Sequence, residues 1–268
     1  MLPTQARRYP IRGRVPSRRA ACAVESHRSC GRSAGNKNNG SVSAPRQNGL
    51  ECPVATQSKT VQLARTTVSC GCHACAFFSS ADEEYDVLVP FVRDGLEAGD
   101  KAFHIADKRH RAERLRRLQG SGLDIAAAEQ AGRFEIRDWE GAYLRDGRFD
   151  QQAMLALIKE VLNAGKQQGF GLTRLWANME WALEEFPGVH DIVEYETRLS
   201  YILRQYDDVV VCTYDLTRFS ASVVMDILRT HQRVIVGGIL RENPFHVPPE
   251  EFLQELRGRK EGAQSPTS

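Results

Sequence analysis

The sequence contains no apolar run that approaches the roughly 18 residues needed to span a bilayer. Its first twenty residues include six arginines and no apolar stretch, so they do not resemble a secretory signal peptide. We therefore expect neither a membrane protein nor a secreted one, and we expect a cytoplasmic location. The seven cysteines, an odd number, are then expected to be reduced thiols.

Acidic residues are scarce at the start of the chain. Residues 1–70 contain 12 basic residues and two acids, a net charge of +10, whereas the remaining residues contain 24 basic and 32 acidic residues, a net charge of −8. The overall pI of about 8.2 is therefore an average over a basic arm and an acidic remainder. Because a folded part of this charge repels nucleic acid, we do not expect nucleic-acid binding by that part.

Residues 1–69 also lack apolar periodicity and are rich in Arg, Ser, Asn, Gly and Pro. Such a segment cannot bury enough surface to offset the entropy lost on ordering, so it is predicted to be a disordered basic arm. Its composition fits a nucleic-acid-binding arm or an organellar transit peptide. We favour a third interpretation, an extension from a start codon placed too early.

From residue 70 onward, short apolar strands alternate with amphipathic helices. Strands are predicted at 73–78, 102–106, 134–137, 172–178, 209–214 and 233–236. The longer helices are predicted at 82–98, 151–168, 189–205, 221–230 and 250–257. This alternation predicts one α/β domain over 70–257, a three-layer sandwich with a mainly parallel sheet, followed by a polar tail over 258–268. Ligands of such folds bind beyond the carboxyl ends of the strands.

A phosphate-binding loop is missing from the predicted domain. The segment after the first strand, Ser79 to Glu84, has no Gly and no Lys and contains three carboxylates, which repel phosphate. The only Gly-Lys pair, Gly165-Lys166, lies near a helix end and lacks the earlier glycine. ATP hydrolysis is therefore not expected, and we predict a protein that is not an enzyme and has no cofactor.

Several short motifs follow one another in a specific order and spacing. They are His73-Ala74-Cys75-Ala76-Phe77-Phe78, Glu84-Tyr85, Pro90-Phe91, Gly95-Leu96-Glu97-Ala98-Gly99-Asp100-Lys101, Tyr143-Leu144, Gly147-Arg148-Phe149-Asp150, Trp181-Ala182-Leu183, Tyr195-Glu196, Tyr214-Asp215 and Asn243-Pro244-Phe245. Together they resemble the MEDS domain, a sensory domain named after methanogens, methylotrophs and the dichloromethane-responsive regulator. The resemblance covers roughly residues 73–255 and none of the basic arm.

The resemblance implies a sheet similar to that of the RecA- and KaiC-like ATPases without Walker A. It also implies a sensor of small organic molecules that acts upstream of transcription or phosphorelay. We find no helix-turn-helix and no kinase module in the sequence, so the output is expected through a partner in trans, such as a kinase, an anti-sigma factor or a transcription factor. The alternatives from other classes are a degenerate KaiC-like nucleotide-binding protein and a metal-dependent enzyme that uses His73 and Cys75.

The candidate ligand-binding residues lie on strands, next to the ends of strands or helices, or, for Glu196, within a predicted helix. They are His73, Cys75, Glu180, Trp181, Glu196, Tyr214, Asp215 and His231. Because side chains alternate along a strand, His73 and Cys75 share one face. They could line an organic-ligand pocket, contribute two ligands to a metal completed by a distant residue, or only pack in the core. A closed zinc site with Cys70 and Cys72 would require a loop instead of a strand.

Structural alternatives exist for the other candidates. Asp215 could cap a turn, and His231 could interact with the carboxyl end of a helix. Glu196 could be the partner of a nearby arginine. Trp181 could fill the core, the usual fate of a large aromatic side chain.

Overall fold

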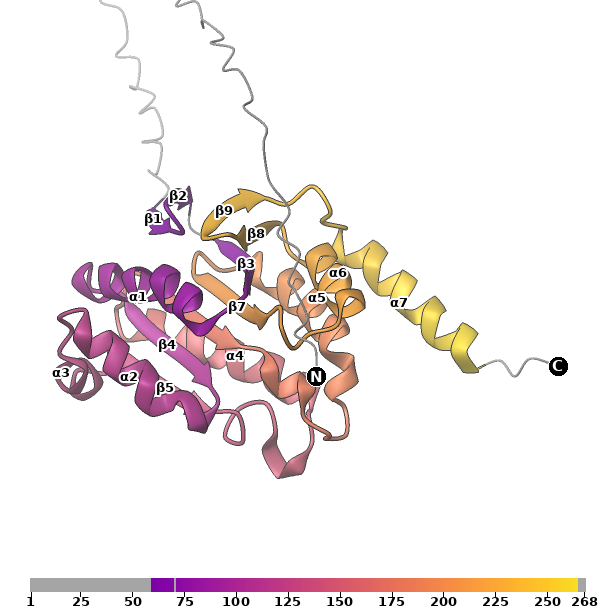
Figure 1. Cartoon of the computed structure of the whole chain (residues 1–268), viewed down its shortest axis with the longest axis horizontal. Helices are drawn as coiled ribbons and strands as arrows, with labels where there is room; N and C mark the ends of the chain where they lie inside the picture. Colours follow the sequence, from indigo (N-terminus) through magenta and orange to yellow (C-terminus); the bar gives the residue numbers. More distant parts are fainter. Residues whose placement is uncertain (1–58, 70, 265–268) are drawn as a thin grey trace, which may run out of the picture. The chain divides into compact units, whose positions relative to one another are not determined.

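The computed structural model describes residues 59–69 and 71–264, and its main feature is a seven-stranded sheet (Figure 1). The strand order is β5-β4-β6-β7-β3-β8-β9. These strands are β3 (Cys72–Phe78), β4 (Lys101–Ala106), β5 (Phe134–Asp138), β6 (Thr173–Asn178), β7 (Val209–Asp215), β8 (Arg233–Val236) and β9 (Ile239–Glu242). All neighbouring strands pair in parallel except β9, which is antiparallel to β8. The predicted α/β class with a mainly parallel sheet is confirmed.

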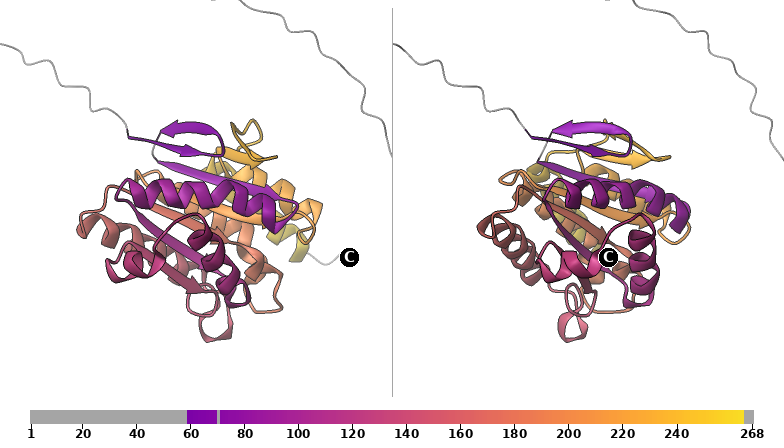
Figure 2. Two further views of the ribbon diagram at one scale, coloured as in Figure 1. Left: turned by 60° about the vertical axis from the view of Figure 1, so that its left-hand side comes forward. Right: turned by 90° about the vertical axis from the view of Figure 1, so that its left-hand side faces the viewer.

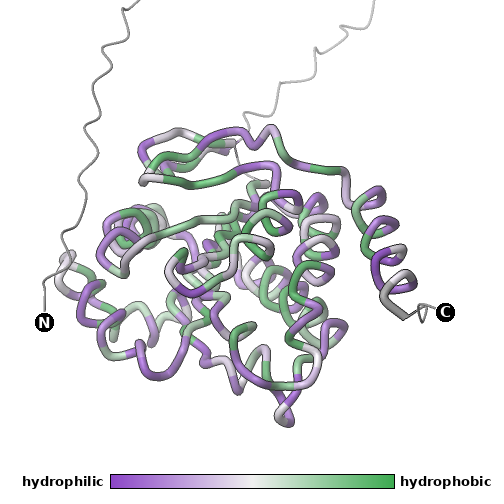
Figure 3. Tube along the Cα trace, turned by 45° about the vertical axis from the view of Figure 1, so that its right-hand side comes forward, coloured by the Kyte–Doolittle hydropathy of each residue, from purple (hydrophilic) through white to green (hydrophobic). Residues whose placement is uncertain are grey.

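Helices cover both faces of this sheet, which gives the three predicted layers (Figure 2). The helices are α1 (Ala81–Glu97), α2 (Arg111–Gly120), α3 (Ile125–Gln130), α4 (Gln151–Gln167), α5 (Ile192–Leu203), α6 (Ala221–Thr230) and α7 (Pro249–Gln264). One core cluster joins one sheet face to α1, α2 and α3, and a second joins the other face to α4, α5 and α6. Hydrophobic segments gather between these layers (Figure 3).

Side chains of β3 alternate between the two core clusters, as the period of a strand requires. Ala74 and Ala76 pack on the side of α1, whereas Cys75 and Phe77 pack on the side of α4, α5 and α6. Helix α1 then begins at a defined residue because the Ser80 side chain accepts a hydrogen bond from the backbone N–H of Glu83.

A hairpin of two short strands corrects the prediction for the end of the basic arm. Strands β1 (Thr60–Leu63) and β2 (Thr66–Ser69) pair antiparallel, with Ala64 and Arg65 at positive φ in the turn. Its buried side chains, Val61, Leu63 and Val68, join the core cluster on the side of α1. The expected disorder is therefore wrong for residues 59–69. Residues 1–58, the rest of the predicted arm, and residue 70 lie outside the described residues.

Helix α7 corrects the prediction of a polar tail over 258–268. The helix continues to Gln264, whereas it was expected to end at residue 257. Ion pairs hold its added turns: Arg259 Nη1 lies 2.7 Å from Asp226 Oδ2, and Lys260 Nζ lies 2.8 Å from Asp191 Oδ1. The last four residues of the chain lie outside the described part. None of the described helices is long and apolar enough to cross a bilayer.

Candidate functional site

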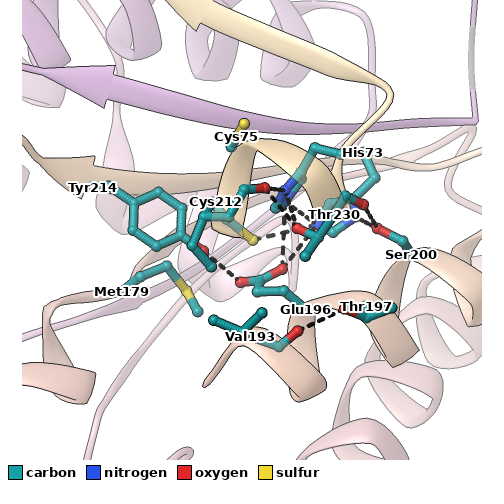
Figure 4. Close-up of polar contacts among 12 residues, drawn as sticks. His73, Cys75, Met179, Val193, Glu196, Thr197, Ser200, Cys212, Tyr214 and Thr230 are labelled. Carbon is teal, nitrogen blue, oxygen red and sulfur yellow. Dashed lines mark hydrogen bonds and ion pairs between the residues drawn. The ribbon is translucent and has the colours of Figure 1, made fainter. Parts of the chain in front are cut away.

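Four polar side chains from four elements meet in the core between the sheet and α5 (Figure 4). We call them the buried polar cluster: His73 of β3, Glu196 of α5, Cys212 of β7 and His231, which follows the last residue of α6. One ligand atom from each lies within 4.8 Å of the other three. The sheet register contributes to this arrangement, since β3 and β7 are neighbours and place Cys75 opposite Cys212.

The two imidazole rings are the closest pair of the buried polar cluster. Their Nε2 atoms lie 3.1 Å apart and their ring centroids 4.2 Å apart. The Oε2 atom of Glu196 lies 3.5 Å from Nε2 of His73 and 3.4 Å from Nε2 of His231. Nε2 of His73 also lies 3.4 Å from Sγ of Cys212. Two nitrogens, one oxygen and one sulfur therefore converge.

Hydrogen bonds around the rings define their tautomers. The Ser200 hydroxyl donates to the backbone carbonyl of Thr230 at 2.7 Å, so its oxygen accepts from Nδ1–H of His73 at 2.8 Å. The Thr230 hydroxyl donates to the carbonyl of Ile227 at 2.8 Å, so its oxygen accepts from Nδ1–H of His231 at 2.6 Å. Nδ1 of His231 also lies 3.1 Å from that carbonyl oxygen, which can only accept. Both rings thus carry a proton on Nδ1. Consequently Nε2 of each neutral ring turns a lone pair toward the other ring and toward Glu196.

The Glu196 carboxylate is fully buried. Its Oε1 accepts a hydrogen bond of 2.8 Å from the Tyr214 hydroxyl, whereas its Oε2 has no hydrogen-bond donor among the described residues. A buried carboxylate is costly unless a cation or hydrogen-bond donors compensate it. No arginine of the described residues pairs with Glu196, whose charged neighbours are His73 and His231, so the structure does not support the arginine alternative.

Burial and neighbouring charges move the pKa values of the cluster. Burial lowers the pKa of His73 well below its ordinary value, and the nearby His231 lowers it further. Burial also lowers the pKa of His231, but the adjacent Cys75, Cys212 and Glu196 outweigh that effect and raise it well above its ordinary value. Burial, followed by Glu196, raises the pKa of Tyr214. These directions favour a proton on His231 over a proton on His73.

The structure thus brings together His73, Glu196, Tyr214 and His231 from the predicted set. It places Cys75 beside them on the shared face of β3, with Sγ 3.7 Å from the backbone carbonyl of Arg233. Cys72 faces the opposite side of the sheet, so the zinc site formed by residues 70–75 is wrong. The helix-end interpretation of His231 is confirmed, because its ring also bonds the Ile227 carbonyl in the last turn of α6.

Three other predicted residues lie elsewhere. Trp181 is fully buried and stacks on Tyr143 at 4.6 Å, so it belongs to the aromatic core. Asp215 accepts hydrogen bonds from the backbone N–H and the hydroxyl of Thr217, which is the turn-capping role. Glu180 is paired with Arg218. Glu180 and Asp215 both line a pocket at the carboxyl ends of the strands.

This pocket has a volume of about 310 Å³. Its walls come from the end of β3, the start of α1, one side of α2 and the ends of β6 and β7. Tyr214 connects the two sites, because it lines the pocket while its hydroxyl bonds Glu196. We call it the strand-end pocket.

Arg114 is the most unusual side chain of the strand-end pocket. It is only 2% exposed, and its guanidinium lies 3.7 Å above the ring of Trp176. Its Nη2 lies 3.6 Å from Oε1 of Glu84, but its Nε and Nη1 have no hydrogen-bond partner among the described residues. Burial lowers the pKa of Arg114 from its ordinary value. Two donors of a buried guanidinium are therefore unused.

Glu84 holds the base of the strand-end pocket together. Its Oε1 accepts hydrogen bonds from Trp176 Nε1 at 2.8 Å and from Thr213 Oγ1 at 2.9 Å. The sequence reasoning missed Arg114 and Cys212 as site residues. Cys212 could have been found from its spacing, because it precedes Tyr214 by two residues on a strand and so shares its face.

The family model of the MEthanogen/methylotroph, DcmR Sensory domain matches residues 72–232. This chain belongs to the MEDS family. The match includes every residue of the buried polar cluster and all the residues that line the strand-end pocket. The predicted resemblance is confirmed.

This MEDS domain is similar to two known proteins. The chain is 27% identical over 180 residues to the transcriptional repressor DcmR of Methylorubrum extorquens, and the match covers 67% of this chain and 64% of that protein. A KaiC-like protein of the archaeon Pyrococcus horikoshii has a solved structure that is 19% identical, with a TM-score of 0.45. That match covers 62% of this chain and 70% of the archaeal one.

Proposed function

We propose that this MEDS domain is a non-catalytic sensor that binds a small organic molecule in the strand-end pocket and regulates transcription through a partner protein. The observation that carries the proposal is Arg114, which is buried at the pocket with two unused hydrogen-bond donors. A buried donor without a partner costs about 1–3 kcal/mol, and more when it is charged. A ligand that offers oxygen acceptors to Arg114 would recover that free energy.

The walls of the strand-end pocket support a small ligand with an apolar part. Phe78, Tyr85 and Tyr214 contribute aromatic surface, while Arg114 contributes the polar anchor. An acceptor such as a carboxylate or a hydroxyl oxygen on a short carbon skeleton fits this combination. The pocket's own position, beyond the carboxyl ends of parallel strands, is the usual ligand site of such folds.

The charges in the strand-end pocket disfavour a nucleotide. Its acidic side chains are Glu84, Glu113, Glu180 and Asp215. Glu113 is already paired with Arg116 and Arg117, and Glu180 with Arg218, so few cations are free to neutralise a triphosphate. The sequence around Ser80 also has no glycine or lysine to bind phosphate. Binding of MgATP is therefore the result that the titration described below must exclude.

A regulatory output fits the relative named as a transcriptional repressor, of which this chain covers less than two thirds. Within the domain, Tyr214 offers a route from the ligand to the far side of the sheet, since it touches both the pocket and Glu196 of α5. The partner protein would then contact α5 or α6 and respond to a change in the position of that helix. A cytoplasmic location is consistent with this role.

The test is calorimetric titration of the full chain with short carboxylic acids, short alcohols and MgATP. We expect at least one carboxylate or alcohol to bind, and its affinity to fall about 10-fold or more in Arg114→Lys, because Lys cannot present the same donor fork. Arg116→Lys, on the exposed side of the same helix, should bind like the wild type. Binding of MgATP, or equal ligand affinity in the two variants, would refute the proposal.

A further inference from the structure

We propose that the buried polar cluster is a binding site for one divalent transition-metal ion of the zinc class. The inference goes beyond the sensor function and does not rest on it, because no residue of the cluster belongs to the lining of the strand-end pocket. It stands on geometry, on the tautomers of two histidines and on an unsatisfied carboxylate oxygen.

The distances between the ligand atoms fit tetrahedral coordination. Zinc binds His nitrogen at about 2.0–2.1 Å and Cys sulfur at about 2.3 Å, so the edges of the tetrahedron measure roughly 3.3–3.6 Å. The separations from Nε2 of His73 are 3.1 Å to Nε2 of His231, 3.4 Å to the sulfur of Cys212 and 3.5 Å to Oε2 of Glu196. Nε2 of His231 lies 3.4 Å from Oε2 of Glu196. All four ligand atoms lie within 4.8 Å of one another, so the separations longer than an edge would have to shorten to complete the tetrahedron.

The tautomers leave the correct atoms free to bind a metal. Both rings carry their proton on Nδ1, so two Nε2 lone pairs and the free oxygen of Glu196 face one another in a dry interior. Such an arrangement is repulsive unless a cation lies among these atoms. The cation is either a proton on His231 or a metal ion, and the fourth donor, Cys212, favours the metal.

A second shell of hydrogen bonds holds the ligands as it does in known metal sites, where a ligating histidine donates its other N–H to a protein oxygen. Ser200 supports His73, and the Ile227 carbonyl supports His231. Tyr214 supports Glu196. His73, His231 and Glu196 therefore each have a hydrogen-bond partner that orients the side chain toward the site.

The donor set also defines the class of metal. Two imidazoles, one carboxylate and one thiolate suit zinc and its neighbours among the first-row divalent ions, and not magnesium or calcium. On binding, the Cys212 thiol and Nε2 of His231 each lose a proton to solvent, and the sulfur–metal and nitrogen–metal bonds form. The two negative ligands then balance the charge of the divalent ion. Four protein ligands close the site, which indicates a structural or regulatory ion and not a catalytic one.

The experiment uses the full chain, stripped with a chelator and titrated with Co²⁺ and Zn²⁺. We expect one equivalent of Co²⁺ to bind with the visible bands of a tetrahedral ion and a thiolate-to-cobalt charge-transfer band, and Zn²⁺ to displace it. In Cys212→Ser the charge-transfer band should disappear. Ser200→Ala should keep the band and weaken metal affinity about 10- to 100-fold, the usual effect of removing a second-shell partner.

Matched controls separate the cluster from other thiols and imidazoles of the chain. Cys72→Ser changes a buried thiol on the opposite face of β3, and His104→Gln changes a buried histidine outside the cluster. Both should retain one equivalent of Co²⁺ and the charge-transfer band. Circular dichroism shows whether each variant is folded. If Cys212→Ser is unfolded, a folded His231→Gln variant replaces it, and loss of the charge-transfer band in that variant supports the same site.

Two results would overturn the proposal. One is that the folded wild-type chain binds neither Co²⁺ nor Zn²⁺, in which case the cation of the cluster is the proton on His231. The other is that the charge-transfer band survives in Cys212→Ser and disappears only when the four cysteines of residues 1–70 are replaced by serine. The metal would then be held by the N-terminal thiols.

Discussion

The Nε2 atoms of His73 and His231 lie 3.1 Å apart, although the two residues are separated by 158 positions in the chain. Strand β8 pairs with β3, and the loop between α6 and β8 thus places His231 beside the start of β3. The separation of these two histidines depends on the packing of α5, α6 and the sheet. A small movement of α5 or α6 would therefore change the cluster directly.

The first prediction concerns the bond between Tyr214 and Glu196. Tyr214→Phe removes the hydrogen bond that a fully buried carboxylate accepts, the one it has among the described residues. We therefore expect the free energy of unfolding to fall by about 1.5–3 kcal/mol. Urea unfolding measures this change. The control is Tyr201→Phe on the exposed side of α5, which should lie within about 0.5 kcal/mol of the wild type. Equal stability of the two variants would show that the bond contributes nothing.

The second prediction concerns the hairpin at residues 60–69. Leu63 is 1% exposed, so Leu63→Ala should lower the free energy of unfolding by about 2–5 kcal/mol. Its neighbour Gln62 is exposed, and Gln62→Ala should have little effect. Thermal denaturation of both variants tests whether the hairpin is part of the folded domain. If Leu63→Ala melts at the wild-type temperature, the hairpin does not pack on the core.

The third prediction concerns alkaline pH. Burial, opposed by Arg233, raises the pKa of Cys72 from 9.0 to about 11. The thiol is protonated in both states below pH 9, whereas the unfolded chain loses its proton first above that value, so stability falls as pH rises toward 11. At about pH 10 this thiol alone costs about 1.4 kcal/mol.

Urea unfolding of the wild type and of Cys72→Ala at about pH 8 and about pH 10 measures this contribution. The variant should lose less stability between the two pH values than the wild type, because the other buried groups with raised pKa values remain in both proteins. Identical losses would mean that Cys72 titrates alike in the folded and unfolded chain.

The fourth prediction concerns the base of the strand-end pocket. Glu84 accepts two hydrogen bonds and is the nearest carboxylate to Arg114. Glu84→Gln keeps the shape but removes the charge, which leaves the guanidinium without a counter-ion. We expect a loss of about 3–5 kcal/mol of folding stability. The exposed Asp86→Asn on the same helix is the control, and an equal effect of both changes would contradict this account.

The sequence predicted the sheet well because strand and helix periods are local properties. It also predicted that His73 and Cys75 share a face, since that follows from the period of a strand. It could not reveal the partnership of His73 with Cys212 and Glu196, because that depends on the register of β3 with β7 and on the packing of α5. Contacts between residues far apart in the chain leave no pattern in the sequence around each residue.

Two other features escaped prediction for local reasons. The hairpin strands are only four residues long and follow a polar, arginine-rich segment, so their alternation was hidden by their surroundings. Arg114 lies on a helix with three other arginines, and nothing in its immediate sequence separates it from the exposed ones. Its burial is decided by Trp176, which lies on a distant strand.

The most direct test of the sensor account is hydrogen exchange of the full chain with and without the strongest-binding small molecule. We predict slower exchange at the carboxyl ends of β3, β6 and β7 and along α2, where Arg114 lies, with loss of that protection in Arg114→Lys. Protection confined to another surface, such as the groove between α5 and α7 near Tyr201, would contradict the account.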